Sequence, residues 1–236
     1  MPHRISACKD IIDSILKTGI DWLEFNIPEY SVRTKQEYII PEWLENMPNV
    51  KIFRTPDYGP LTKVLPTFQR HQNSTGYIIT FDDDTVYLPG LVERYRPFLG
   101  NDVVGSYGGL VDGYKWQAKL GQKATFLYGY GSTVYPMNIF KDDLKYFLET
   151  NKNSDCFQSD DIILSNFAYK KGRKCVVVFE RKFAVNCQLL TGIQDPLGLC
   201  NQGNTGRKIV ACIRHLQSIG ECHLHIVPKV YSRFIK

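Results

Sequence analysis

The sequence of 236 residues lacks several features that would place it in a specialised class of protein. Nothing in it approaches the roughly 18 uninterrupted apolar residues of a membrane-spanning helix. The first residues lack the charged and then apolar pattern of a signal peptide, and there is no internal repeat or low-complexity linker. We therefore expect a single domain over residues 1–236, no stable membrane span and a cytoplasmic location.

Paired cysteines are lacking as well. The seven cysteines stand singly and none forms a Cys-x-x-Cys pair, which argues against a zinc ribbon. An odd number of isolated cysteines favours reduced thiols in a cytosolic protein. One metal-ligand set, Cys222 with His223 and His225, is left open by the spacing.

A strong charge of either sign is also absent. The chain has 29 basic and 24 acidic residues, a net charge of +5, spread along its length. The densest basic cluster comprises Lys170, Lys171, Arg173 and Lys174. Such a cluster is usually a solvated surface, so we expect an anionic small ligand at most and no nucleic-acid partner.

What is present is an alternation of helix-like and strand-like segments. Strand patterns at 21–27, 50–54 and 76–81 alternate with helical patterns at 8–17, 34–46 and 59–71, the second of these interrupted by Pro41. The stretch 76–81 is too apolar to be half exposed, which predicts a central parallel strand covered on both faces. This order predicts an α/β layered sheet. The second half adds expected strands at 102–107, 124–128 and 175–179, and expected helices at 138–149, 160–171 and 206–217.

The stretch "YIITFDDDTVYLPG" places three aspartates directly after that strand. Ligands of α/β sheets bind beyond the carboxyl ends of strands, and adjacent carboxylates repel one another unless a cation is near. On an extended segment Asp82 and Asp84 point to one side and Asp83 to the other. The pair then suits Mg²⁺ or Mn²⁺, which takes oxygen ligands together with substrate phosphates. The alternative is an aspartate-rich turn that caps a helix over 89–99.

A second acidic motif is "QSDDIILSNFAYKKG", residues 158–172. Ser159 is placed as an N-cap, so Asp160 and Asp161 fall in the first helical turn. They either complement the helix dipole or present a carboxylate that accepts a proton from a hydroxyl nucleophile.

Two turns complete the candidate site. In "LYGYGSTVYP", Gly129 and Gly131 permit a close backbone approach to a ligand or form a plain tight turn. In "RTPDYGPLTK", residues 54–63, a helix N-terminus and Lys63 can meet a phosphate, or the prolines and Gly59 only shape a loop.

In this order the segments resemble glycosyltransferases of the GT-A type, close to the inverting family 2 enzymes. "ITFDDD" is similar to the family's Asp-x-Asp signature, with Asp82 at its first position and Asp84 at its metal-ligating last position. "SDDIIL" resembles the acidic motif in which Asp161 matches the catalytic base and Asp160 the acidic residue before it. "GYGSTVYP" is similar to a loop on the acceptor side, and "DYGPLTK" resembles a segment that approaches the donor nucleotide.

The resemblance implies a Rossmann-like GT-A fold, a mixed and mostly parallel sheet with helices on both faces. Residues of about 1–100 would form the nucleotide-binding half and about 101–236 the acceptor half. Because the chain opens with "MPHRI", at the turn that follows the family's first strand, that strand is expected to be absent. The donor-binding residues so implied are Arg4, Asp57, Lys63, Asp82, Asp83, Gly129 and Gly131.

The activity implied is a metal-dependent sugar transfer with inversion. The resemblance implies Mn²⁺ or Mg²⁺ on Asp84 and Asp82, a UDP-sugar or similar donor, and a saccharide or glycoprotein acceptor. Asp161 acts as the base. His215, His223 and His225 compete for a further ligand position.

Two other classes of function stay open. "DDDTV" also fits a phosphatase of the haloacid dehalogenase type, with Asp82 as nucleophile and Asp84 as acid/base, although that signature normally lies on the first strand of its domain. The third class is a non-catalytic domain that binds a sugar nucleotide.

Overall fold

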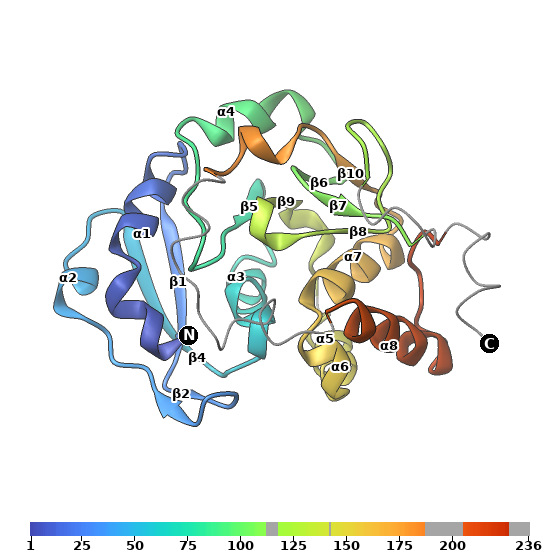
Figure 1. Ribbon diagram of the computed structural model, residues 1–236, viewed down its shortest axis with the longest axis horizontal. Coiled ribbons are helices and arrows are strands. Elements are labelled where there is room, and N and C mark those ends of the chain that lie inside the picture. Colours follow the sequence, from blue (N-terminus) through green and yellow to red (C-terminus); the bar gives the residue numbers. More distant parts are fainter. Residues whose placement is uncertain (112–117, 142, 187–204, 227–236) are drawn as a thin grey trace.

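The computed structural model describes residues 1–111, 118–141, 143–186 and 205–226, which form a mixed α/β protein with small mixed sheets (Figure 1). The largest sheet has the strand order β10-β6-β9-β5. In this sheet β10 and β6 are parallel, and β9 runs antiparallel to both β6 and β5. Its strands are β5 (Tyr77–Thr80), β6 (Val103–Gly105), β9 (Thr133–Pro136) and β10 (Cys175–Val177).

Three strand pairs accompany this sheet. A parallel pair joins β1 (Leu23–Pro28) to β4 (Val50–Thr55). Antiparallel pairs join β2 (Tyr30–Ser31) to β3 (Gln36–Glu37), and β7 (Gly108–Gly109) to β8 (Phe126–Leu127).

Helices lie at both ends of the molecule, with α3 between them and α4 along the upper edge (Figure 1). At the N-terminal end α1 and α2 accompany β1 and β4, and at the other end α5 to α8 pack together. The helices are α1 (Lys9–Leu16), α2 (Glu42–Glu45), α3 (Leu65–Arg70), α4 (Leu91–Tyr95), α5 (Leu144–Thr150), α6 (Ser154–Phe157), α7 (Asp160–Lys170) and α8 (Thr205–Ser218). Short 3₁₀ helices lie at Pro2–Ala7, Gly59–Lys63, Arg96–Phe98, Gly129–Gly131, Met137–Ile139 and Arg181–Phe183.

Both faces of the four-stranded sheet are covered. Successive strand residues enter different hydrophobic clusters: Ile78 and Tyr135 face the cluster built with α3, α5 and α7, whereas Ile79 and Val134 face the cluster built with α1 and α4. Because the two clusters cover both faces, the middle positions of β5 and β9 are apolar, whereas Tyr77 at the start of β5 is 41% exposed and Thr80 at its end is polar. Helical residues contribute to both clusters, and the α/β class of the fold is confirmed.

The structure corrects the predicted sheet. The expected central parallel strand at 76–81 is β5, which pairs antiparallel with β9 and lies at the edge of its sheet. The expected mostly parallel sheet is wrong for the described residues, whose strands form small mixed sheets. The apolar sequence of β5 reflects burial on two faces, which by itself does not fix the direction of the neighbouring strand.

The expected helix at 34–46 is also wrong. Its first part is the β2–β3 hairpin, closed by Lys35 with φ 56°, and only α2 is helical. Pro41 has an extended backbone and is the N-cap of α2, since proline cannot continue a preceding helix. The other expected helices and strands of the described residues are present with shifted ends, and β2, β3, β7, β9 and α6 were not predicted. No helix in the described part of the chain is long and apolar enough to cross a membrane.

A disulfide joins α6 to α8. Cys156 and Cys212 lie 56 residues apart in sequence and are fully buried, with their Cα atoms 4.7 Å apart. The expectation of reduced thiols is therefore wrong for this pair, because sequence spacing does not show which cysteines meet in space. Cys8, Cys175 and Cys222 are free thiols, and Cys187 and Cys200 lie outside the described residues.

Breaking this disulfide is expected to destabilise the protein. Opening a covalently closed loop of this size typically costs about 2–4 kcal/mol, because the unfolded chain gains freedom. Urea unfolding of the wild-type protein with and without dithiothreitol measures the loss of unfolding free energy. Cys156→Ser should be as unstable as the reduced wild-type protein. Cys222→Ser is the matched control and should stay sensitive to dithiothreitol. Alkylation of Cys156 in native, unreduced protein would contradict the pairing.

Candidate active site

Sheet register brings three segments of the chain to one edge of the sheet. Thr133 at the start of β9 pairs with Thr80 at the end of β5 and with Gly105 at the end of β6. Because β9 is antiparallel to both neighbours, the residues after β5 and β6 lie beside the residues before β9. The Asp82–Asp84 stretch, Ser106 with Tyr107, and the Gly129–Gly131 turn therefore converge there.

The three aspartates divide between two basic side chains. Asp82 accepts from Lys63, with Oδ1 2.8 Å from Nζ. Arg4 Nη1 donates to Asp83 Oδ1 at 2.8 Å and to Asp84 Oδ2 at 2.7 Å. The expected alternation, with Asp83 alone on the far side, is wrong, because Asp83 and Asp84 form a turn instead of an extended segment and share Arg4.

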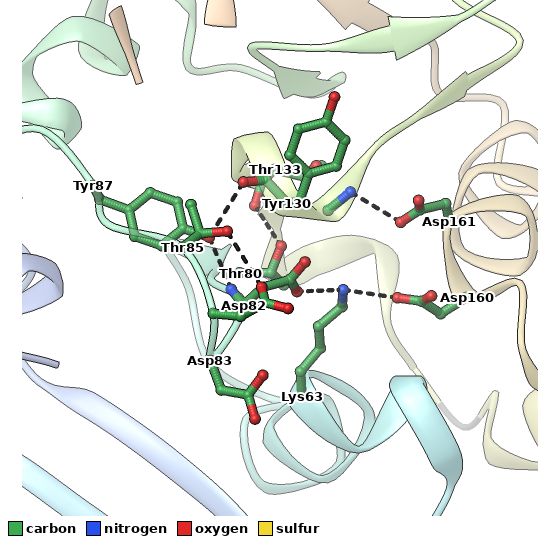
Figure 2. Close-up of polar contacts among 12 residues, drawn as sticks. Lys63, Thr80, Asp82, Asp83, Thr85, Tyr87, Tyr130, Thr133, Asp160 and Asp161 are labelled. Carbon is green, nitrogen blue, oxygen red and sulfur yellow. Dashed lines mark hydrogen bonds and ion pairs between the residues drawn. The ribbon is translucent and has the colours of Figure 1, made fainter. Parts of the chain in front are cut away.

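Lys63 is the centre of the site (Figure 2). Its Nζ lies 2.8 Å from Asp82 Oδ1 and 2.8 Å from Asp160 Oδ2, so one ammonium bridges the end of β5 and the first turn of α7. Burial lowers the pKa of Lys63, but the carboxylates of Asp160, Asp82 and Asp161 outweigh it and hold the pKa well above its ordinary value. Lys63 is therefore a permanent cation.

The carboxylates outnumber their cations. Burial is the largest influence on Asp82 and, together with repulsion from Asp84, raises its pKa despite Lys63. For Asp83 burial acts in the same direction, but the Met1 amino group and Arg4 prevail and lower its pKa. Five carboxyl groups, at 82–84 and 160–161, lie beside three cationic groups, Lys63, Arg4 and the Met1 amino group. The site therefore carries excess negative charge.

The first turn of α7 supplies Asp160 and Asp161. Ser159 occupies the N-cap position as expected, but its hydroxyl donates to the Asp155 carbonyl and makes no capping bond. Asp161 Oδ1 accepts from Gly129 N at 2.9 Å (Figure 2). Burial, followed by repulsion from Asp160, raises the pKa of Asp161 well above its ordinary value. When ionised, Asp161 is therefore a stronger base than a solvated aspartate.

Gly129 and Gly131 are required by close packing. A Cβ at position 129 would lie 2.5 Å from Lys63 Nζ and 3.2 Å from Asp161 Oδ1. At position 131 it would lie 2.6 Å from Ser106 Oγ. The turn is thus packed closely against Lys63 and Asp161 at Gly129 and against Ser106 at Gly131, and an approach of its backbone to a ligand stays a prediction.

The remaining predicted residues have structural partners. Asp57 Oδ2 accepts from Val32 N at 2.8 Å and Oδ1 from Gly59 N at 2.7 Å, which fixes the turn before Lys63. Its contact with a donor stays a prediction. His223 lies 3.6 Å from Glu221, and the His225 ring lies 6.4 Å from Tyr169. Among the described residues no group of three or more His, Cys, Asp or Glu side chains forms a metal site, so neither a third ligand nor the Cys222 set is assigned.

Sequence reasoning missed the tyrosines of the site. The Tyr87 hydroxyl accepts from Asp82 N at 2.8 Å and donates to the Tyr130 carbonyl at 3.4 Å (Figure 2). It thereby joins the aspartate stretch to the glycine turn. The only signal was the repeated tyrosine of "YGYG", since Tyr87 follows the aspartates in a segment without periodicity.

No protein-family model matches this chain, and no curated protein matches it significantly.

Proposed function

We propose that this protein is a metal-dependent inverting glycosyltransferase of the GT-A type that moves a sugar from a nucleoside-diphosphate donor, a UDP-sugar being the first candidate, to an acceptor hydroxyl. The observation that carries the proposal is the arrangement of two carboxylate sets around Lys63. One set follows a strand and suits a cation with a diphosphate, and the other, on α7, suits proton removal.

The residues present fit a divalent cation. Lys63 contacts one oxygen of Asp82 and Arg4 contacts one oxygen of Asp84, and both carboxylates are partly exposed, at 25% and 34%. Mg²⁺ and Mn²⁺ commonly bind through one or two carboxylates plus substrate phosphates, so a third side chain is not needed. Asp82 and Asp84 would hold the ion, which when bound supplies stabilisation of the charge on the leaving diphosphate. The excess negative charge of the site favours this occupancy.

The chain's own groups account for the other roles. Asp161 removes the proton of the acceptor hydroxyl as its oxygen bonds to the anomeric carbon, while the bond from that carbon to the diphosphate oxygen breaks. The Gly129 amide orients the Asp161 carboxylate. Lys63 and Arg4 place positive charge beside the diphosphate, in keeping with the expected donor contacts of Lys63, Arg4 and Asp83. Asp160 holds Lys63 in place.

A thermal-shift screen of UDP, GDP and their sugars with and without Mn²⁺ tests this proposal. We expect one nucleotide to raise the melting temperature only when Mn²⁺ is present, and slow Mn²⁺-dependent hydrolysis of the matching sugar donor. Absence of both effects for every nucleotide would contradict the proposal. Binding without hydrolysis or transfer would favour the non-catalytic sugar-nucleotide-binding domain.

Asp84→Asn is expected to weaken Mn²⁺-dependent nucleotide binding about tenfold or more, because it removes one anionic ligand of the ion. Titration calorimetry of UDP at saturating Mn²⁺ measures the change. Asp13→Asn is the matched control, since Asp13 pairs with Lys9 on the exposed side of α1. Equal nucleotide affinity in wild type and Asp84→Asn would remove Asp84 from the metal site.

The phosphatase alternative gains no support from the site. Its signature normally lies on the first strand of a domain, whereas β1 and β4 precede β5 in this chain. Release of phosphate from p-nitrophenyl phosphate, lost in Asp82→Asn, would favour that class. A cytoplasmic location, the boundary between donor and acceptor halves near residue 100, and a saccharide or glycoprotein acceptor stay predictions.

A further inference from the structure

Three tyrosine rings gather beside the turn that binds Asp161. The ring centroids of Tyr107 and Tyr128 are 4.8 Å apart with nearly parallel planes. Tyr130 lies 5.3 Å from Tyr107 and 5.7 Å from Tyr128. All three side chains are partly exposed, whereas the core residues Tyr87 and Tyr95 are each 1% exposed. The cluster therefore differs from internal packing, because aromatic surface reaches solvent.

The backbone beneath these rings is fixed. Tyr128 N donates to the Tyr107 carbonyl at 3.0 Å, and the Ser106 hydroxyl donates to the Gly131 carbonyl. Tyr87 holds the Tyr130 carbonyl from the aspartate side. Binding of a ligand to the rings would thus cost little conformational entropy, because the backbone that carries them is already ordered.

A basic side chain borders the cluster. Arg181 Nη1 donates to the Tyr130 hydroxyl at 2.8 Å. Its Cζ lies 5.5 Å from the centre of the Tyr107 ring and 5.3 Å from that of Tyr130. Aromatic faces beside phenol and guanidinium groups match the chemistry of a sugar ring, which has an apolar C–H face and a rim of hydroxyls.

The position of the cluster connects it to the reaction. Tyr128 and Tyr130 flank Gly129, whose amide binds Asp161 at 2.9 Å. The pKa of Tyr128 is raised by burial and, second, by the negative charge of the nearby Asp161 carboxylate. The Tyr130 ring lies on the other side of the turn from Lys63 (Figure 2), away from the place proposed for the donor phosphates.

We propose that Tyr107, Tyr128 and Tyr130, bordered by Arg181, form a saccharide-binding platform for the acceptor. The acceptor is then a sugar, in preference to a lipid or a protein side chain. The word acceptor rests on the proposed glycosyltransferase function, but saccharide binding by the platform does not.

Fluorine NMR of the full chain labelled with 3-fluorotyrosine tests the platform without donor or metal. The probes are maltotriose, xylotriose and triacetylchitotriose. Single Tyr→Phe variants assign the resonances by their disappearance. We expect at least one probe to shift the three platform resonances saturably and to leave Tyr30 and Tyr77, which are 47% and 41% exposed, unshifted. No shift with any probe, or equal shifts at Tyr30 and Tyr77, overturns the platform.

Substitution then separates ring stacking from other contacts. Tyr128→Leu is expected to weaken binding of the active probe about three- to tenfold, whereas Tyr128→Phe, which keeps the ring, binds within about twofold of wild type. Unchanged binding by a folded Tyr128→Leu overturns the platform.

The outcomes for the two proposals are distinguishable. Saccharide binding without any sugar transfer rejects the glycosyltransferase and keeps the platform. Transfer whose acceptor KM is unchanged in Tyr128→Leu keeps the enzyme and rejects the platform.

Discussion

Asp161→Asn is expected to reduce sugar transfer by about 10²- to 10⁴-fold while it stabilises the fold. The amide keeps an oxygen to accept from Gly129 N but cannot take the proton of the acceptor. Donor binding should be unchanged, because Asp161 belongs to neither the Asp82–Asp84 stretch nor its ion pairs. Transfer at the wild-type rate would show that another group is the base.

The stability effect follows from the direction of the pKa shift. Burial and Asp160 raise the pKa of Asp161 above its value of 3.8 in the unfolded chain. Its contribution to stability is therefore fully present below pH 3.8 and is lost as pH rises through the folded pKa. At neutral pH this contribution is reduced, so Asp161→Asn should melt higher than wild type, by a margin that shrinks as pH falls towards 4. Such a trade of stability for activity is common at reactive sites. Lower stability of the variant across this range would contradict the assigned shift.

Lys63→Met is expected to cost about 3–5 kcal/mol of folding stability at neutral pH, because it leaves Asp82 and Asp160 without their shared buried cation. The loss should diminish in acid, where the carboxyl groups are protonated. Urea unfolding at neutral and acidic pH measures it, and transfer should be lost with the donor contact.

A matched control and a double variant complete this test. Lys9→Met removes an ion pair of the same length, 2.8 Å, on an exposed helix surface and should leave stability nearly unchanged. In Lys63→Met/Asp160→Asn the second change removes one unpaired charge and should restore part of the loss. Equal, small effects of Lys63→Met and Lys9→Met would show that the bridge contributes nothing.

The sequence predicted segments well where periodicity and burial agree. The helix α1, with Ile11, Ile12 and Ile15 buried on one face, and β5, with Ile78 and Ile79 at its middle, are examples. The prediction failed at β9, which has four residues and ends in a proline, and at residues 34–37, where the β2–β3 hairpin replaces a helix. Strand direction and the Cys156–Cys212 pairing depend on contacts between distant segments, which local patterns do not encode.

The candidate residues were predictable as motifs, but their partners were not. Lys63 was expected to bind a phosphate. In the structure it bridges Asp82 and Asp160, which lie 78 positions apart in the sequence. Arg4 was assigned only through the resemblance, and it binds two of the three aspartates. Such ion pairs depend on which distant residues the fold brings together. The residue types alone show only that charges of opposite sign are present in the chain.

The register of β9 has a consequence for which changes of chain length the protein tolerates. A one-residue insertion within β9 would exchange Val134 and Tyr135 between the two hydrophobic clusters. The same shift would carry the Gly129 amide away from Asp161. Residues 32–35, which close the β2–β3 hairpin, join no strand of the central sheet. Length variation among any relatives of this chain should therefore gather at that hairpin and avoid residues 128–136.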